Sequence, residues 1–203
     1  METVHFTTDI RHTLKEVLHT RKYSKLVVLT DENTREHCLP LIQDALPSDT
    51  VLITVPAGEQ HKTLETCSSI WTAMTEAVLD RQALVINLGG GVIGDMGGFC
   101  ASVYKRGVPF LTIPTTLLSQ VDASVGGKLG IDFMGFKNHL GVFQLPEKVL
   151  IDPIFLANGC RKNGRRNKVS SFAKNRKSVY LEFIRCPPLV FLLNQFSAAN
   201  SKL

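Results

Sequence analysis

The sequence predicts an α/β fold in which a parallel β-sheet is covered by helices. Short, uninterrupted apolar runs recur along the chain, a pattern typical of strands that are covered on both faces. Stretches of helical length separate these runs, and a cluster of three glycines directly follows one of them. Strands that alternate with helices at this spacing form βαβ units, and such units build a parallel sheet.

The elements that this alternation predicts extend from the N-terminus to Asp152. A short edge strand is expected at 3–7, and Asp9 is the expected N-cap of an amphipathic helix at 10–19. The strand expected at 26–30 is followed by Asp-Glu-Asn-Thr, which supplies capping residues. Further buried strands are expected at 51–55, 83–88 and 110–113, and further helices at 35–46, 63–79 and 93–105. The apolar side of the helix at 63–79 is expected to contain Leu64, Ile70, Met74, Ala77 and Val78.

The composition predicts an ordered protein without a membrane segment or a disulfide framework. Hydrophobic residues make up 44% of the chain and charged residues 20%, which suits a buried core. No apolar run is long enough to span a bilayer, and the N-terminus lacks the apolar core of a signal peptide. Five cysteines at irregular spacings favour reduced thiols over disulfides or a zinc site. We therefore expect a cytoplasmic protein without a membrane partner.

The positive charge of the chain belongs almost wholly to its last part. Residues 1–156 contain 13 Lys and Arg against 17 Asp and Glu, whereas residues 157–203 contain 10 against 1. We therefore divide the chain into an α/β domain at 1–156 and a basic tail at 157–203. We interpret the abrupt shift in composition as a change of reading frame. The alternative is a true basic extension that binds nucleic acid or acidic surfaces, which the absence of a stacking pattern among its aromatic residues disfavours.

The glycine cluster predicts a phosphate-binding turn. Residues 89–95 read Gly-Gly-Gly-Val-Ile-Gly-Asp, which satisfies G-x-G-x-x-G between an expected strand and an expected helix. Without Cβ atoms the backbone can approach a pyrophosphate, and the helix N-terminus offers N–H groups and the positive end of a dipole. The alternative is a tight turn whose glycines only permit close packing. An acidic residue at a strand end can accept hydrogen bonds from a ribose, and Asp31 is the candidate in this Rossmann-like arrangement.

The longest ordered set of motifs runs from Gly89 to Asp152. It contains GGGVIGDMGGFCASVYKRG, then PTTLLSQVDASVGGK, and then FKN at 136–138, while PAGEQHKT stands upstream at 56–63. This set resembles the N-terminal domain of the 3-dehydroquinate synthase family, whose upstream motif is P-x-G-E-x-x-K. The resemblance implies a homodimer that uses NAD and a divalent metal, zinc or cobalt. The implied reaction converts a small sugar phosphate, 3-deoxy-D-arabino-heptulosonate 7-phosphate, to 3-dehydroquinate in the shikimate pathway, with loss of phosphate.

The resemblance also implies which residues bind NAD and which contact the substrate. The expected cofactor set is Glu59, Lys62, Gly91, Val92, Ile93, Gly94, Asp95, Thr115, Thr116, Lys128 and Lys137, to which the strand-end argument adds Asp31. The expected substrate set is Asp122, Lys128, Asn138 and, from a neighbouring subunit, Arg106. Within these sets Glu59 and Lys62 match the adenosine side, and Asp122 matches a residue near the nicotinamide. Lysine and amide side chains are suitable donors to phosphate and hydroxyl oxygens.

Each of these residues also has a local structural explanation. The alternatives are a solvated i,i+3 pair for Glu59 and Lys62, a cap for Thr115, Thr116 or Asp122, a surface position for Lys128 or Lys137, and a favourable helix end for Arg106. His139 invites a metal interpretation, but the family has no metal ligand at this position, so we expect a loop or packing residue there.

The resemblance ends soon after Leu156. The family continues into a helix of the G-F-A-E-x-x-K type, whose glutamate is a metal ligand, and two histidines of a helical C-terminal domain complete the metal site. Here 171–174 reads Ser-Phe-Ala-Lys, with lysine in place of glutamate, and no histidine follows His139. We therefore expect a truncated or replaced C-terminal domain, no metal ligands, and impaired or absent activity.

Two other functions stay open at this point. A related polyol dehydrogenase or inosose synthase of the same fold group would act on another substrate. A non-catalytic remnant would bind NAD without metal binding or phosphate release.

Overall fold

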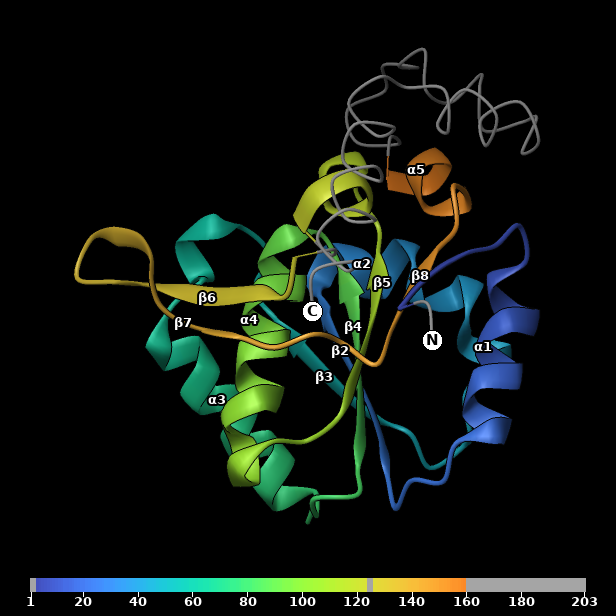
Figure 1. The fold of residues 1–203 in the computed structure, drawn as a ribbon, viewed down its shortest axis with the longest axis horizontal. Coiled ribbons are helices and arrows are strands. Elements are labelled where there is room, and N and C mark those ends of the chain that lie inside the picture. Colours follow the sequence, from blue (N-terminus) through green and yellow to red (C-terminus); the bar gives the residue numbers. More distant parts are fainter. Residues whose placement is uncertain (1–2, 124–125, 160–203) are drawn as a thin grey trace, which may run out of the picture.

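The computed structural model describes residues 3–123 and 126–159, which form helices on both faces of a central sheet (Figure 1). This arrangement confirms the predicted α/β class. The basic tail predicted at 157–203 lies outside the described residues from residue 160 onward, and so does the segment 171–174.

The middle layer is a sheet of six parallel strands. They are β1 (Val4–Phe6), β2 (Leu26–Asp31), β3 (Val51–Val55), β4 (Leu84–Gly89), β5 (Phe110–Pro114) and β8 (Lys148–Ile151). Their order is β1-β8-β5-β4-β2-β3, so β1 is an edge strand, as predicted. β3 forms the other edge, and the prediction that it is covered on both faces is wrong. Its Leu52 is 45% exposed, because an edge strand has a neighbour on one side only.

Two helices lie on each face of the sheet (Figure 1). α1 (Ile10–Thr20) and α2 (Glu32–His37) cover one face, and α3 (Leu64–Glu76) and α4 (Gly91–Val103) cover the other. Asp9 caps α1 as predicted, because its Oδ1 accepts the N–H of His12 at 3.1 Å. A short helix, α5 (Ile154–Gly159), follows β8.

A separate apolar core fills each interface between sheet and helices. Successive side chains of a strand point to opposite faces. In β4, Leu84, Ile86 and Leu88 therefore belong to the core under α1 and α2, whereas Val85 belongs to the core under α3 and α4. The central strands β2, β4 and β5 contribute to both cores.

The helix predicted at 35–46 is the largest error in the predicted elements. α2 ends at His37, and two 3-10 turns, Leu39–Leu41 and Gln43–Ala45, replace its expected continuation. Pro40 explains this break, because proline lacks an N–H and disfavours helical dihedrals in the residue before it.

The helix predicted at 63–79 ends earlier than expected. Thr63 is its N-cap, and α3 stops at Glu76. Val78 has a φ of 54° and is 75% exposed, and Leu64 is 38% exposed, so neither belongs to the buried side of α3. Ile70 and Met74 are fully buried, as predicted.

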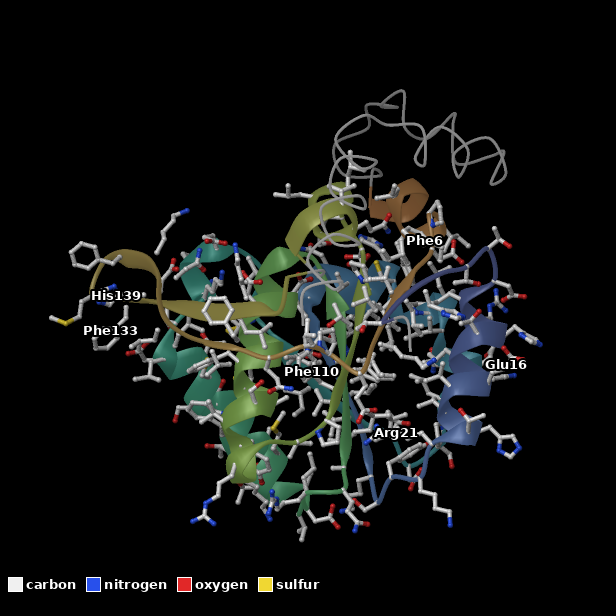
Figure 2. All side chains as sticks on the ribbon, viewed as in Figure 1. Phe6, Glu16, Arg21, Phe110, Phe133 and His139 are labelled. Carbon is white, nitrogen blue, oxygen red and sulfur yellow. The ribbon has the colours of Figure 1, made fainter. Side chains whose placement is uncertain are left out.

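An antiparallel hairpin that the strand–helix alternation did not predict packs against α4. β6 (Lys128–Phe133) pairs with β7 (Phe136–Phe143) as a separate two-stranded sheet. Gly98 of α4 leaves room for Leu129, since a Cβ on this glycine would lie 2.6 Å from the Leu129 Cδ2 atom. The other end of the hairpin projects beyond the helices, where Phe133 lies (Figures 1 and 2).

Candidate cofactor site

The carboxyl ends of β2 and β4 meet where the strand order changes direction. The chain leaves β2 toward α2 on one face of the sheet, and it leaves β4 toward α4 on the other. Ligands of open parallel sheets bind in the crevice outside such a switch point. Asp31, at the end of β2, and the glycine turn, at the end of β4, both lie at this edge.

The turn between β4 and α4 has a tight backbone. Gly90 is the N-cap of α4, and its C=O accepts the N–H of Gly94 at 2.9 Å. The C=O of Gly89 accepts the N–H of Thr115 at 2.9 Å, which ties the turn to the end of β5. A Cβ on Gly90 would lie 3.0 Å from the Thr116 Cγ2 atom, so a larger residue would crowd that side chain. The first N–H groups of a helix lack intrahelical partners, which suits an anionic ligand.

Lys62 and Asp95 form a largely buried ion pair in which the second partner comes from the start of α4. The distance from Lys62 Nζ to Asp95 Oδ2 is 2.6 Å, and the side chains are 3% and 20% exposed. The alternative explanation of Glu59 and Lys62 as a solvent-exposed i,i+3 ion pair is therefore wrong. Lys62 points inward, whereas Glu59 faces Lys137 at the surface with a Nζ–Oε1 distance of 3.7 Å.

Asn138 joins this ion pair from the hairpin. Lys62 Nζ also donates to Asn138 Oδ1, at 2.6 Å. Lys62 precedes α3, Asp95 lies in α4 and Asn138 lies in β7, so three separate segments meet here. We call Lys62, Asp95 and Asn138 the polar cluster. All three were predicted site residues, and the structure brings them together.

Asp31 has a structural role as the N-cap of α2, and its contact with a ribose stays a prediction. Its Oδ1 accepts the backbone N–H of Thr34 at 2.7 Å and the Thr34 hydroxyl at 3.1 Å, so it caps α2, as expected from the Asp-Glu-Asn-Thr sequence. Burial and, to a smaller extent, the nearby Asp31 carboxylate raise the pKa of Cys38 to about 12, against the opposing effect of a hydrogen bond with Thr115. Asp31 and Thr115 therefore lie close to the same buried thiol.

The segment after β5 forms a capped turn. Thr116 Oγ1 accepts the N–H of Ser119 at 3.3 Å, and Ser119 Oγ accepts the N–H of Thr116 at 3.1 Å, which confirms a capping role for Thr116. The π-helical turn Ser119–Ala123 contains the backbone of Asp122, whose side chain lies outside the described part of the structure. Lys128 opens β6 and is exposed, as its surface alternative predicts.

Arg106 and His139 lie away from the glycine turn. Arg106 follows α4, at the opposite end of this 13-residue helix from Gly91, and it is exposed with a φ of 69°. A helix of that length spans roughly 20 Å, so Arg106 does not reach the turn of its own chain. His139 lies on the projecting part of the hairpin, with its ring centroid 5.3 Å from that of Phe136, which fits a packing residue (Figure 2).

Asp132, which is not among the predicted site residues, contacts the polar cluster. Its Oδ1 accepts the N–H of Asn138 at 2.8 Å, and its own N–H donates to the C=O of Lys62 at 2.9 Å. The only sequence signal for a role of Asp132 was its position within the set of motifs from Gly89 to Asp152. Only the pairing of β6 with β7 shows that its carboxylate faces Asn138.

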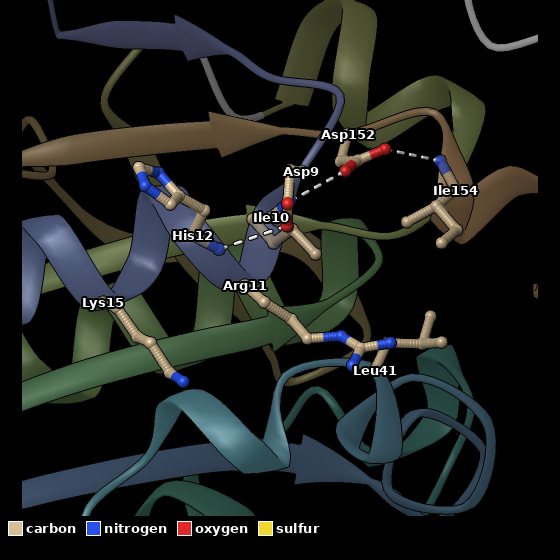
Figure 3. Close-up of a pocket in the computed structure, with 8 residues that line it drawn as sticks. All are labelled: Asp9, Ile10, Arg11, His12, Lys15, Leu41, Asp152 and Ile154. Atoms are coloured by element: carbon tan, nitrogen blue, oxygen red, sulfur yellow. Dashed lines mark hydrogen bonds between the residues drawn. The ribbon is translucent and has the colours of Figure 1, made fainter.

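A pocket of about 370 Å³ lies elsewhere, at the start of α1 (Figure 3). It is lined by Asp9, Ile10, Arg11, His12, Lys15, Leu41, Asp152 and Ile154. The buried Asp152 accepts the N–H groups of Ile10 at 3.0 Å and of Ile154 at 2.8 Å, so it fastens β8 to α1. None of the lining residues belongs to the predicted sets, and the pocket is not part of the candidate site.

The described residues include no group of three or more His, Cys, Asp or Glu side chains that could hold a metal ion. Within the same residues, Cys38, Cys67 and Cys100 are buried free thiols. A hydrogen bond with the Cys67 thiol and burial raise the pKa of Cys100.

No helix in ranges 3–123 and 126–159 has both the length and the apolar character to cross a membrane.

Comparison with known sequences identifies relatives over most of the chain. The family model of the 3-dehydroquinate synthase N-terminal domain matches residues 52–166. The 3-dehydroquinate synthase of Parabacteroides distasonis is 43% identical over 168 residues, which are 82% of this chain and 46% of that protein. That of Sulfurovum sp. (strain NBC37-1) is 49% identical over 134 residues, 66% of this chain and 38% of the relative. The chain therefore spans less than half the length of these relatives.

Solved structures with the same fold include two synthases. The 2-epi-5-epi-valiolone synthase of Streptomyces hygroscopicus subsp. jinggangensis 5008, solved with NAD+ and Zn2+ bound, is 31% identical with a TM-score of 0.68, over 77% of this chain and 44% of that one. A 2-deoxy-scyllo-inosose synthase is 21% identical with a TM-score of 0.65, over 76% and 44%, which shows a shared fold. By sequence and by fold, the chain belongs to the 3-dehydroquinate synthase family, of which it contains the N-terminal domain.

Proposed function

We propose that the chain binds NAD at the carboxyl edge of its sheet, as the nucleotide-binding part of a 3-dehydroquinate synthase. The observation that carries the proposal is the polar cluster beside the first turns of α4. The Lys62 side chain, 3% exposed, needs compensating partners, because removing a charge from water costs on the order of several kcal/mol. The placement of such a costly group next to a phosphate-binding type of turn supports a ligand site.

The glycine turn suits a dinucleotide on three grounds. It lies at the switch point of the sheet, its glycines keep side chains away from the backbone, and it opens a helix whose first N–H groups lack intrahelical partners. The valiolone synthase that is 31% identical was solved with NAD+ bound, which supports the same cofactor here.

Each predicted residue has a place in this proposal. The cofactor residues are Asp31 for a ribose, Glu59 and Lys62 for the adenosine side, Gly91, Val92, Ile93, Gly94 and Asp95 for the pyrophosphate, and Thr115, Thr116, Lys128 and Lys137 around the rest of the dinucleotide. Substrate contacts are assigned to Asp122, Lys128 and Asn138. The phosphate contact of Arg106 requires a second subunit, and the homodimer and the cytoplasmic location stay predictions from the resemblance.

The chemistry of this chain's own residues is binding and orientation. Bound NAD supplies a hydride acceptor for oxidation of a secondary hydroxyl. Lysine ammonium groups such as Lys128 hold phosphate oxygens as point charges, and the Asn138 amide orients a hydroxyl. The described residues do not provide a ligand set for the family's zinc or cobalt, so we assign no step to a metal. Conversion of 3-deoxy-D-arabino-heptulosonate 7-phosphate to 3-dehydroquinate is thus proposed for the family site as a whole.

Two alternatives are separable from this function. A related synthase or polyol dehydrogenase, favoured by the likeness to the valiolone synthase, would use the same cofactor site with another substrate. A remnant that binds NAD without turnover is favoured by the lysine at 174, where the family motif has its glutamate ligand.

Titration of NAD into the purified chain by calorimetry tests the proposal. We expect one NAD per chain, and we expect Gly91→Val to bind at least tenfold more weakly, because its side chain occupies the space through which the backbone approaches the pyrophosphate. Lys105→Met, at the other end of α4, is the control and should bind like the wild type. Absence of NAD binding, or equal binding by Gly91→Val, contradicts the proposal. Phosphate release from the heptulosonate phosphate, with and without zinc, then separates the synthase from the remnant.

A further inference from the structure

The β6–β7 hairpin contains an irregularity at the polar cluster. Ile131 pairs with Leu140 and Phe133 pairs with Phe136. Between these pairs a single residue of β6, Asp132, therefore lies opposite the three residues 137–139 of β7. Such a bulge interrupts the ladder and changes the direction of a side chain, and bulges are frequent beside active sites.

The backbone of the bulged segment adopts an unfavourable conformation at Asn138, which contacts from other residues stabilise. Asn138 has a φ of 50°, in the left-handed region that side-chain-bearing residues adopt rarely, although asparagine tolerates it better than most. In this conformation its N–H points at Asp132 Oδ1, 2.8 Å away, and its side-chain oxygen accepts from Lys62 Nζ at 2.6 Å. The direction of the Asn138 side chain and the hydrogen bond of its backbone are thus set together.

Asp132 also contacts the other end of the same interaction. Its backbone N–H donates to the C=O of Lys62 at 2.9 Å. One residue therefore holds the backbones of both Lys62 and Asn138, whose side chains meet each other. The Asp132 carboxylate is only partly buried, and its bond to Asn138 lies at an exposed position. An exposed hydrogen bond adds little to global stability, so its main effect is local.

We propose that Asp132 is a positioning residue, which closes the β-bulge of the hairpin and thereby aims the Asn138 side chain at Lys62, the ion-pair partner of Asp95. The inference rests on the proposed NAD site, because it concerns the geometry of that site. Asp132 acts through Asn138 and Lys62 and touches no ligand itself. We therefore predict that removal of the Asp132 carboxylate weakens NAD binding, and that a side chain with an acceptor oxygen in the same place restores NAD binding.

Two variants and a control test this inference by NAD calorimetry on the full chain. Asp132→Ala is expected to bind NAD about tenfold more weakly, which corresponds to the loss of one well-placed hydrogen bond. Asp132→Asn keeps an acceptor oxygen and should bind within about twofold of the wild type. The control is Asp80→Ala, which removes two exposed bonds far from the site, since Asp80 Oδ1 accepts the N–H of Gln82 at 2.8 Å and the Ser24 hydroxyl at 2.5 Å.

A double variant separates positioning from general damage. If Asp132 acts through Asn138, Asp132→Ala combined with Asn138→Ala should bind NAD no more weakly than Asn138→Ala alone. Additive losses, failure of Asp132→Asn to rescue, or wild-type affinity of Asp132→Ala would each overturn the inference while leaving the NAD site in place. Failure of the wild-type chain itself to bind NAD is a different result, which refutes the proposed function and this inference with it.

Discussion

Burial separates residues of identical chemistry in this domain. Lys62 and Lys137 are both predicted cofactor lysines, yet their side chains are 3% and 75% exposed. Lys62 forms short bonds to Asp95 and Asn138, whereas the Nζ–Oε1 distance from Lys137 to Glu59 is 3.7 Å. Charges removed from water interact far more strongly than charges at a surface. Only Lys62 is therefore expected to matter for stability.

Replacement of each lysine by methionine tests this difference. We expect Lys62→Met to lower the free energy of unfolding by about 3 kcal/mol, because Asp95 loses its ion-pair partner in a largely buried place. Lys137→Met should cost less than about 1 kcal/mol, as for other exposed pairs. Urea denaturation followed by circular dichroism measures both values. The double change Lys62→Met with Asp95→Leu should recover part of the loss, and equal costs for the two single variants would contradict the argument.

At the scale of elements, α4 shows how one glycine-rich helix serves two purposes. Its N-terminal glycines form the turn, whereas later ones allow other elements to approach. A Cβ on Gly97 would lie 2.2 Å from Asn87 Oδ1 and 2.7 Å from Leu29 Cδ2, both on fully buried residues of central strands. A Cβ on Gly94 would meet nothing nearer than Thr112 Cγ2 at 4.0 Å. Close packing against the sheet therefore requires glycine at position 97, whereas packing does not require it at position 94.

Alanine at these two positions should have opposite effects on stability. Gly97→Ala is expected to lower the free energy of unfolding by about 2 kcal/mol, because α4 must move away from the sheet. Gly94→Ala has room for its methyl group and should leave stability unchanged or raise it by up to about 1 kcal/mol through better helix propensity. Thermal and urea denaturation of both variants provide the measurement. A destabilised Gly94→Ala with an unaffected Gly97→Ala would show that the packing of α4 differs from that described.

At the scale of the whole molecule, the two apolar cores share one sheet. β2, β4 and β5 each place side chains in both cores. Loss of packing on one face must therefore disturb the strands that support the other. Trp71, on the α3–α4 side, and Cys38, on the α1–α2 side, offer a probe for each face.

We expect both faces to unfold in a single transition. Trp71 is the only tryptophan of the chain, and its Nε1 donates to the C=O of Cys100 at 3.1 Å, so its fluorescence reports the packing of α3 on α4. Cys38 is 3% exposed and has its pKa raised to about 12, so at pH 8 it should react with iodoacetamide only after unfolding. Mass spectrometry of the Cys38 peptide after brief alkylation in increasing urea gives the second curve. Reaction of Cys38 at a lower urea concentration than the fluorescence change would reveal two separate units.

The same raised pKa sets the sign of one pH effect. The folded state holds the Cys38 proton more tightly than the unfolded state does, because burial disfavours the thiolate. Its contribution to stability is therefore complete below the pKa of an unfolded cysteine and is lost as the pH rises toward about 12.

The sequence by itself determined the α/β class, most strands, the cap at Asp9 and the chemical nature of the turn after β4. These features depend on local patterns, such as apolar runs, capping residues and glycines, which act over a few neighbouring residues. Only the tertiary structure decided that Lys62 is buried while Lys137 is exposed, and that Asp132 holds Asn138. These features depend on contacts between segments far apart in the chain, such as Lys62 with Asn138, and on the pairing of two strands across a bulge. No periodicity in the sequence encodes such a register, because it is set by which surfaces remain to be covered once the sheet and its helices have packed.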